Sequence, residues 1–200
     1  MTMKLTREFY LNPDVVAVSK SLLGKYLFTC IDGVISGGII TETEAYAGVN
    51  DKASHAFGGK RTARTEIMFW QGGTAYVYLC YGIHSLFNVV TNIDGIPHAV
   101  LVRAIYPSYG TATILERRKA KKLDDKFTVG PGKVATALGI HFSQSGKDLL
   151  DTEIWIEDRG FSIPENLIHI GSRIGVDYAG EDAKLPYRFW VEHKDLKTLL

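Results

Sequence analysis

Cysteine is scarce in this chain of 200 residues, which holds only Cys30 and Cys80. Two cysteines are too few for a disulfide framework, and their separation does not match the spacing of zinc ligands. No apolar run approaches the roughly 18 residues of a membrane-spanning helix. The first thirty residues also lack the charged-then-apolar pattern of a secretory signal. We therefore expect a reduced, intracellular protein that is not secreted and has no membrane segment.

A large net charge is absent as well. Lysine and arginine number 23 against 22 aspartates and glutamates, which leaves a net charge of +1. Attraction of the whole chain to nucleic acid is therefore excluded, and contact with DNA would need local basic clusters. Two such clusters exist, at residues 60–64 and 117–122. Each fits either a phosphate-binding site or an ordinary solvated surface.

The common motifs for metal, phosphate and covalent chemistry are missing. The six histidines are scattered, and none lies at ligand spacing from a cysteine or carboxylate. Residues 130–133 include a lysine but lack the spacing and the hydroxyl of a phosphate-binding loop. No serine lies in a Gly-x-Ser-x-Gly turn. We therefore expect no metal, no cofactor and no covalent catalysis by serine or cysteine.

The chain has the composition of an ordinary globular protein. Apolar residues make up 46% and charged residues 22%. Its length is close to that of one domain, and it shows no repeat, linker or break in composition. We predict a single domain over residues 1–200 of the α+β class, with a curved antiparallel or mixed β-sheet and surrounding helices.

Local patterns predict the order of the elements. A helix should begin with Asn12 as its N-cap and close at Gly24. A hairpin should follow, with strands at 25–31 and 34–46 around a tight turn. Residues 47–63 read as a long loop. Further strands are predicted at 74–80, 86–93, 100–105 (stopped by Pro107), 154–156 and 188–191, and helices at 109–121 and 133–138.

The strand that ends at Tyr46 carries the first candidates for chemistry. Strand alternation places Ile40, Glu42, Glu44 and Tyr46 on one face. Two carboxylates and a tyrosine beside a polar loop suit a general base next to an aromatic surface, and they also fit a solvated face. Arg103 lies inside an apolar run, where an unpaired guanidinium costs several kcal/mol. We expect Glu44 to be its partner.

Aromatic residues gather in the same half of the chain. Aromatic faces beside one base suit the binding of a flat ring and the cleavage of an adjacent bond. Two of these residues, Tyr76 and Tyr78, also fit ordinary strand packing. The group comprises Tyr46, His55, Tyr76, Tyr78, Tyr81 and Phe87.

Ten short motifs resemble, in order and spacing, the alkyladenine (3-methyladenine) DNA glycosylase family. The likeness runs from Leu5 to Val191. Each motif alone is weak, and their common order makes the resemblance specific. They are Glu42-Thr43-Glu44-Ala45-Tyr46, Ser54-His55 with Gly58-Gly59, Met68-Phe69, Gly73-Thr74-Ala75-Tyr76-Val77-Tyr78, Tyr81-Gly82, Asn88, Leu101-Val102-Arg103-Ala104, Gly130-Pro131-Gly132-Lys133, Arg173-Ile174-Gly175-Val176 and Pro186-Tyr187-Arg188-Phe189.

The resemblance implies a monofunctional DNA glycosylase of base excision repair. Its substrates would be flipped alkylated purines in double-stranded DNA, such as 3-methyladenine and 7-methylguanine, with hypoxanthine and ethenoadenine as further candidates. It implies a monomer that needs no cofactor and works in the cytoplasm, or on DNA in a nucleoid or nucleus. Such purines are cationic, and aromatic faces attract cations by about 0.5–2 kcal/mol. Since no lysine forms a Schiff base, no lyase activity is expected.

The resemblance also implies a role for each site residue. Glu44 would be the general base that activates water, and Arg103 and the main-chain carbonyl of Ile174 would hold that water. The base pocket would comprise Tyr46, His55, Tyr78, Asn88 and Leu101. Tyr81 would enter the duplex, and Arg64, Ile83, His84 and Lys133 would lie near the DNA backbone or the minor groove. Ile83 and His84 stand where family members often have a bulkier pair.

Two other functions fit part of the same pattern. A hydrolase of free nucleosides would use Glu44 and the aromatic pocket but would not need Tyr81 or Arg64. A non-catalytic DNA-binding module would not need Glu44 and Arg103 together.

Overall fold

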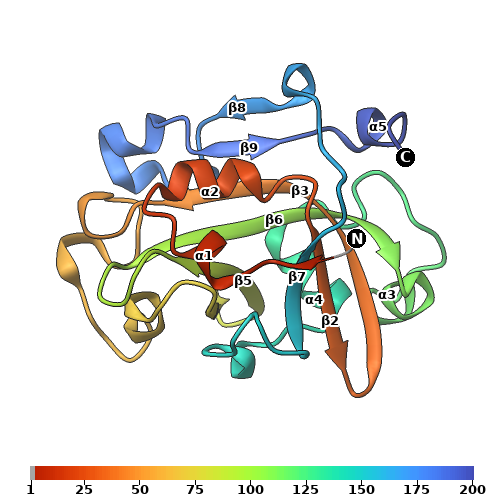
Figure 1. Cartoon of the computed structure of the whole chain (residues 1–200), viewed down its shortest axis with the longest axis horizontal. Helices are drawn as coiled ribbons and strands as arrows, with labels where there is room; N and C mark the ends of the chain where they lie inside the picture. The colour runs from red at the N-terminus through yellow and green to blue at the C-terminus, as the bar shows by residue number, and fades with distance from the viewer. Residues whose placement is uncertain (1–2) are drawn as a thin grey trace.

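The computed structural model, which describes residues 3–200, is built on one curled β-sheet with helices packed around it (Figure 1). The main path of the sheet runs β1-β7-β2-β3-β6-β5-β4, and the hairpin of β8 and β9 joins it at β3. The predicted α+β class is confirmed. Every strand pair in the described residues is antiparallel, so the mixed alternative does not apply.

The elements have the following bounds. The strands are β1 (Met3–Lys4), β2 (Tyr26–Ile31), β3 (Val34–Tyr46), β4 (Ala75–Cys80), β5 (His84–Thr91), β6 (His98–Tyr109), β7 (Ile154–Asp158), β8 (His169–Gly171) and β9 (Arg188–Trp190). The α-helices are α1 (Arg7–Tyr10), α2 (Val15–Ser21), α3 (Thr111–Arg117), α4 (Pro131–Leu138) and α5 (His193–Leu196). Within residues 3–200, no helix is both long and apolar enough to cross a membrane.

Helix α2 packs on β3 with the apolar face that the sequence predicts. Val15 and Val18 are buried in the main core. The predicted N-cap was wrong, because Asp14 and not Asn12 caps the helix. The Asp14 carboxylate accepts hydrogen bonds from the main-chain N–H groups of the helix's second and third residues. Asn12 instead accepts from the Asp14 N–H, which places it outside the helix.

Strands β2 and β3 form the predicted hairpin around Asp32 and Gly33. Both turn residues have positive φ, 53° and 75°, as a two-residue hairpin turn requires. Further along β3, Gly38 passes so close to β6 that a Cβ there would lie 2.5 Å from the carbonyl oxygen of Tyr106. Glycine is therefore required where the two strands pass each other.

Three register shifts interrupt the pairing of β3 with β6, and two of them lie on either side of Glu42. Ile40 lies in the same buried cluster as Ala45, which faces away from Glu44. The predicted sharing of one face by Ile40, Glu42 and Glu44 was therefore wrong, because an irregularity between Ile40 and Glu42 reverses the alternation. Glu42 and Glu44 themselves stay on one face, as predicted.

Strand β6 is longer than predicted. Pro107 does not stop it, because Pro107 pairs with Gly38 next to a register shift and the strand continues to Tyr109. Proline is tolerated at such irregular positions, where its missing N–H breaks no regular hydrogen bond. The helix predicted from residue 109 begins at Thr111, after Gly110 in the left-handed region with φ 64°.

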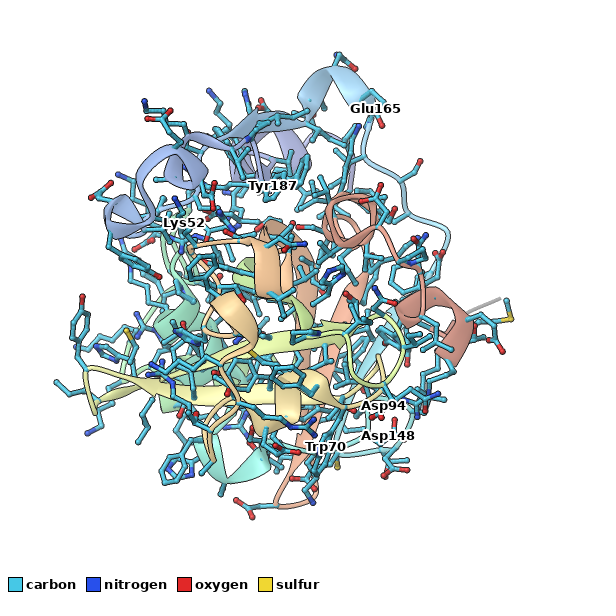
Figure 2. The ribbon with its side chains drawn as sticks, turned by 90° about the vertical axis from the view of Figure 1, so that its left-hand side faces the viewer. Lys52, Trp70, Asp94, Asp148, Glu165 and Tyr187 are labelled. Atoms are coloured by element: carbon cyan, nitrogen blue, oxygen red, sulfur yellow. The ribbon has the colours of Figure 1, made fainter. Side chains whose placement is uncertain are left out.

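A buried ion pair fastens the loop after β3 to the sheet. Arg173 donates to both carboxylate oxygens of Asp51 and to the main-chain carbonyl of Ala45, the latter at 2.9 Å. Its guanidinium also lies 5.2 Å from the ring of Tyr187. Figure 2 labels Tyr187 and also Lys52, which belongs to the loop after β3. The predicted long loop therefore has a fixed path against the end of β3.

We predict that Asp51→Asn lowers the free energy of unfolding by about 3–5 kcal/mol, because it leaves the Arg173 guanidinium buried without its carboxylate partner. The matched control is Glu181→Gln, which removes a carboxylate from an exposed pair with Lys184 and should cause no measurable loss. Urea unfolding measures both. Equal stability of Asp51→Asn and the control would show that the ion pair does not hold the loop.

Candidate active site

Glu44 lies at the centre of the site and is fully buried, where β3 pairs with β6 on one side and β9 on the other. The main-chain N–H of Ile174 donates to its Oε1 at 2.8 Å, and the Tyr46 hydroxyl donates to its Oε2 at 2.8 Å. Glu42 is also buried, with 6% of its surface exposed. The solvated-face alternative for these two carboxylates is therefore wrong.

Arg103 contacts both carboxylates. Its Nε lies 3.3 Å from Oε1 of Glu44 and 2.9 Å from Oε1 of Glu42. The predicted pairing with Glu44 is therefore present, but the shorter contact is to Glu42. Glu42 accepts a further hydrogen bond at 2.7 Å from Nε of Arg188 on β9. Two carboxylates and two guanidinium groups thus form one partly buried cluster.

Burial dominates the electrostatics of Glu44. It raises the pKa of Glu44 above the usual value; Arg103 and the hydrogen bonds from Ile174 and Tyr46 lower the pKa, and Glu42 raises it again. The net direction is upward. Burial and the adjacent Glu44 raise the pKa of Tyr46 as well, so Tyr46 remains a hydroxyl donor. A buried carboxyl with a raised pKa is a stronger proton acceptor than a solvated one, which suits a general base.

A cavity of about 510 Å³ opens beside this cluster. Its volume lies within the range of small-molecule pockets. Glu44 lies behind the cavity wall and not on it, since its carboxylate is covered by Tyr46, Arg103 and Ile174. The predicted site residues in the wall are Tyr46, His55, Arg64, Tyr78, Tyr81, Asn88, Leu101, Arg103 and Ile174.

Aromatic rings form one side of the cavity. The His55 and Tyr78 ring centroids lie 4.7 Å apart at 80°, and those of Tyr76 and Tyr78 lie 5.4 Å apart. Tyr76 is almost fully buried and packs with Met68, whereas Tyr78 is half-buried. Both side chains line the cavity, and ordinary strand packing accounts for more of Tyr76 than of Tyr78.

His55 is held as a neutral ring with a defined tautomer. Arg64 Nη2 lies 3.1 Å from its Nε2, and the Tyr76 hydroxyl lies 2.9 Å from its Nδ1. Because a guanidinium only donates, Nε2 accepts and the ring proton is on Nδ1. Burial, with Arg64 and Lys60 nearby, lowers the pKa of His55 to about 4. His55 is therefore uncharged at neutral pH.

Arg64 itself lies over the aromatic wall. Its Cζ is 4.7 Å from the ring centre of Tyr78, a cation–π distance. The residue predicted to lie near the DNA backbone thus lies at the cavity. The aromatic surface already attracts a planar cation from the protein's own chain.

The tip of the β4–β5 hairpin carries the residues predicted to enter or grip the duplex. Tyr81 is 91% exposed and has φ 51°, and Gly82 follows with φ 70°. Ile83 is 75% exposed, and His84 is exposed beside it. The positive φ values turn the chain sharply and leave the Tyr81 side chain projecting at the cavity mouth.

Three predicted site residues make contacts that the sequence does not predict. The main-chain N–H of Ile174 donates to Glu44, and the expected contact of its carbonyl with the attacking water stays a prediction. Asn88 pairs with Leu101, as neighbours in the sheet, and its amide group donates to the carbonyls of Tyr76 and Leu86. Lys133, which was predicted to lie near the DNA backbone, lies outside the aromatic cavity. It lines a separate one of about 290 Å³ and donates to the Lys126 carbonyl.

Sequence reasoning missed several residues of the site. Glu42 was placed on the correct face but given no role, and Arg188 had no local signal because its partner lies 146 residues away. The remaining wall residues are ordinary side chains whose pattern indicates only packing. They include Ala53, Met68, Leu86, Ala99, Pro131, Val176 and Tyr178. Within residues 3–200, no group of three or more histidine, cysteine, aspartate or glutamate side chains is placed to hold a metal ion.

Comparison with known proteins identifies the family. The family model described as methylpurine-DNA glycosylase (MPG) matches residues 8–195. A relative from Chlamydia felis is 43% identical over 196 residues, covering 98% of this chain and 100% of the relative. One from Clostridium acetobutylicum is 42% identical over 208 residues, covering 99% and 98%. Both carry the provisional name 3-methyladenine DNA glycosylase. The chain therefore belongs to the methylpurine-DNA glycosylase family and is a DNA glycosylase, a hydrolase of N-glycosyl bonds in the repair of alkylated bases.

Proposed function

We propose that this protein removes alkylated purines from double-stranded DNA by flipping the damaged nucleotide into the aromatic cavity and hydrolysing its N-glycosidic bond with a water activated by Glu44. The observation that carries the proposal is the fully buried Glu44 carboxylate, held by Arg103, Tyr46 and the Ile174 N–H beside a cavity of about 510 Å³. The proposed substrates are 3-methyladenine and 7-methylguanine, with hypoxanthine and ethenoadenine as further candidates.

Recognition would rest on charge and shape. A purine alkylated at N3 or N7 is a flat cation, and the Tyr46, His55 and Tyr78 rings offer it electron-rich faces. Neutral His55 adds no repelling charge. Arg64 has to leave Tyr78 before a base can stack there. Flipping costs least for a damaged or mispaired nucleotide, so undamaged duplex is disfavoured before any contact in the cavity.

The chemical step needs one base and one water. Water attacks C1′ of the deoxyribose, its proton passes to Glu44, and a C1′–O bond forms as the C1′–N bond breaks. The electron pair of the broken bond neutralises the positive charge of the alkylated purine, which leaves without being protonated. Arg103 would hold the water and the carboxylate in place. Because no lysine attacks the sugar, the product would be an abasic site, without strand cleavage.

Contact with DNA would use a few local groups. Tyr81 at the hairpin tip would fill the gap left by the flipped nucleotide, with Ile83 and His84 beside it in the groove. Lys133, on α4, would contact phosphate at a distance from the cavity. Since the net charge is only +1, attraction to DNA should come from these few phosphate contacts, and binding should weaken with salt in proportion to their number. We propose that the protein acts as a monomer, in the cytoplasm or on nucleoid or nuclear DNA.

Glu44→Gln should lower single-turnover release of 3-methyladenine from a duplex by about 10²–10⁴-fold, because the shape is kept and only the proton acceptor is lost. Affinity for the lesion duplex should change little. A variant that keeps more than about a tenth of the wild-type rate would remove Glu44 from the role of base. Free 3-methyladenine nucleoside serves as the second substrate, and equal hydrolysis of nucleoside and duplex by the wild type would favour a nucleoside hydrolase.

The same substitution should affect stability in a pH-dependent way. Burial raises the pKa of Glu44 in the folded state above the unfolded value near 4.3, so its protonated form favours folding and its charged form opposes it. Below about pH 4 both states bind the proton, and the melting temperatures of Glu44→Gln and the wild type should differ least. As pH rises through the folded pKa, the melting temperature of the variant should rise relative to that of the wild type. A difference that stays constant or falls with pH would contradict the raised pKa.

Tyr81→Ser should leave thermal stability unchanged, since 91% of the Tyr81 surface is exposed, and should reduce the flipped fraction of an etheno base in a paired duplex. A wedge offsets the unstacking of a few kcal/mol that flipping requires. The defect should shrink when the lesion faces a mismatch or a gap, because less stacking is then lost. Etheno-base fluorescence on binding measures all three contexts. An equal defect in each would rule out a wedge.

A further inference from the structure

Glu42 is a buried carboxylate that the proposed hydrolysis does not use. A single oxygen, Oε1, accepts from Nε of Arg103 at 2.9 Å and from Nε of Arg188 at 2.7 Å. Its side chain is 8% exposed, against 11% for that of Arg103 and 21% for that of Arg188. Burying a carboxylate here costs free energy unless its hydrogen bonds are kept. The presence of the Glu42 carboxylate next to Glu44 therefore needs a physical reason.

The contacts of Arg103 supply that reason. Glu42 holds Nε at 2.9 Å, so that Arg103 contacts Glu44 only loosely, with Nε 3.3 Å from Oε1 and Nη1 3.4 Å from Oε2. The Arg103 side chain also lines the cavity. Without Glu42, the guanidinium would be free to form a close two-point pair with Glu44, the geometry that arginine prefers with a lone carboxylate. Such a pair would lower the basicity of Glu44 and withdraw Arg103 from the cavity.

The fold also brings Arg188 next to Glu42. Beyond the end of its pairing with β2, β3 pairs with β9 at three positions only, from Glu42 to Glu44, and Arg188 lies opposite Glu44 in that register. The β8–β9 hairpin therefore brings a second guanidinium to the middle of the sheet. Two carboxylates then face two guanidinium groups, and Arg103 is shared instead of being captured by Glu44.

We propose that Glu42, held in place by Arg188, is a positioning residue for hydrolysis: it fixes Arg103 and keeps that guanidinium from neutralising Glu44. The inference rests on the proposed function, because it assigns a partner to the proposed general base. It extends that function from a single carboxylate to a four-residue cluster in which Glu42 acts through Arg103.

The charges around Glu44 set the expected direction of a pH effect. Glu42 raises the pKa of Glu44, and Arg103 lowers it. Removing the charge of Glu42 should therefore leave Glu44 a weaker base that is deprotonated at lower pH. The titratable and charged groups that surround Glu44 are Glu42 and Tyr46 from β3, Arg103 from β6, Arg188 from β9, Tyr78 from β4, Asp51 and Arg173 of the ion pair beside β3, and Tyr178.

The test is the pH profile of single-turnover base release by Glu42→Gln on a 3-methyladenine duplex. We expect the plateau rate to fall at least about tenfold, as displaced catalytic groups do, and the acid limb to move to lower pH by about half a unit or more. Duplex affinity should stay within about twofold. A lower plateau with an unmoved limb would mean a structural role only, and an unchanged profile would mean none; either overturns the proposal.

Two further variants keep the result interpretable. Glu42→Gln combined with Arg188→Gln removes one charge of each sign, so the cluster keeps equal numbers of positive and negative charges. This double variant replaces the single one if the latter folds poorly, and it should show the same shift of the acid limb. Asp148→Asn is the matched control, because it removes a carboxylate from another arginine pair, with Arg7, outside the cavity. It should change stability without moving the limb.

Failure of the proposed function would look different. If Glu44 is not the base, Glu44→Gln stays active, and the acid limb of the wild type does not depend on that residue. If Glu44 is the base and Glu42 has no part in positioning, Glu44→Gln is inactive while Glu42→Gln keeps both the wild-type plateau and the wild-type limb.

Discussion

Burial of the Glu44 carboxylate is the constraint on which the rest of the structure depends. A charge in the middle of a sheet is costly unless opposite charge and hydrogen bonds surround it. Three separate parts of the chain meet this need, with Arg103 from β6, the Ile174 N–H from the segment after β8, and Tyr46 from the end of β3. The long loop and the β8–β9 hairpin are both fastened to β3 within a few residues of Glu44. The sheet is therefore built around a group that weakens it, an arrangement typical of sites where function outweighs stability.

The electrostatics of the cavity also favour positive charge. Its aromatic wall attracts cations, and in the free protein Arg64 supplies one by lying over Tyr78. A guanidinium and an alkylated purine are both flat and positively charged, so the contact made by Arg64 resembles the one proposed for the substrate. His55 fits this arrangement because Arg64 and burial keep it neutral, with its proton directed to Tyr76. Under the proposed function, a base that stacks on Tyr78 displaces Arg64 from this ring.

Local sequence patterns predicted much of the sheet but less of the site. The β2–β3 hairpin and the apolar face of α2 followed from turn residues and periodicity, because those signals are contained in a few adjacent residues. The choice of Asp14 over Asn12 as the cap is also local, and the sequence offered both residues within one turn. The passage of β6 through Pro107 depends instead on its pairing with Gly38 of β3. The pairing of Arg103 with Glu44 was predictable, since a charge in an apolar run needs a partner. The contact of Arg188 with Glu42 was not, because the strand at 188–191 was predicted but its pairing with β3 is long-range. The individual site roles came from the family resemblance, and residues such as Lys133 show that common motifs need not converge on one cavity.

The function proposed for this protein requires that deprotonation of the buried Glu44 carboxylate switches on base release. The most direct measurement is the titration of Glu44 by carboxyl ¹³C NMR in the free protein and in a complex with a non-hydrolysable lesion duplex, assigned by loss of the signal in Glu44→Gln. We expect the pKa of Glu44 to lie above the usual glutamate value in the free protein, and its value in the complex to coincide with the acid limb of single-turnover base release. An acid limb that persists at a pH where the Glu44 signal does not titrate would contradict this expectation.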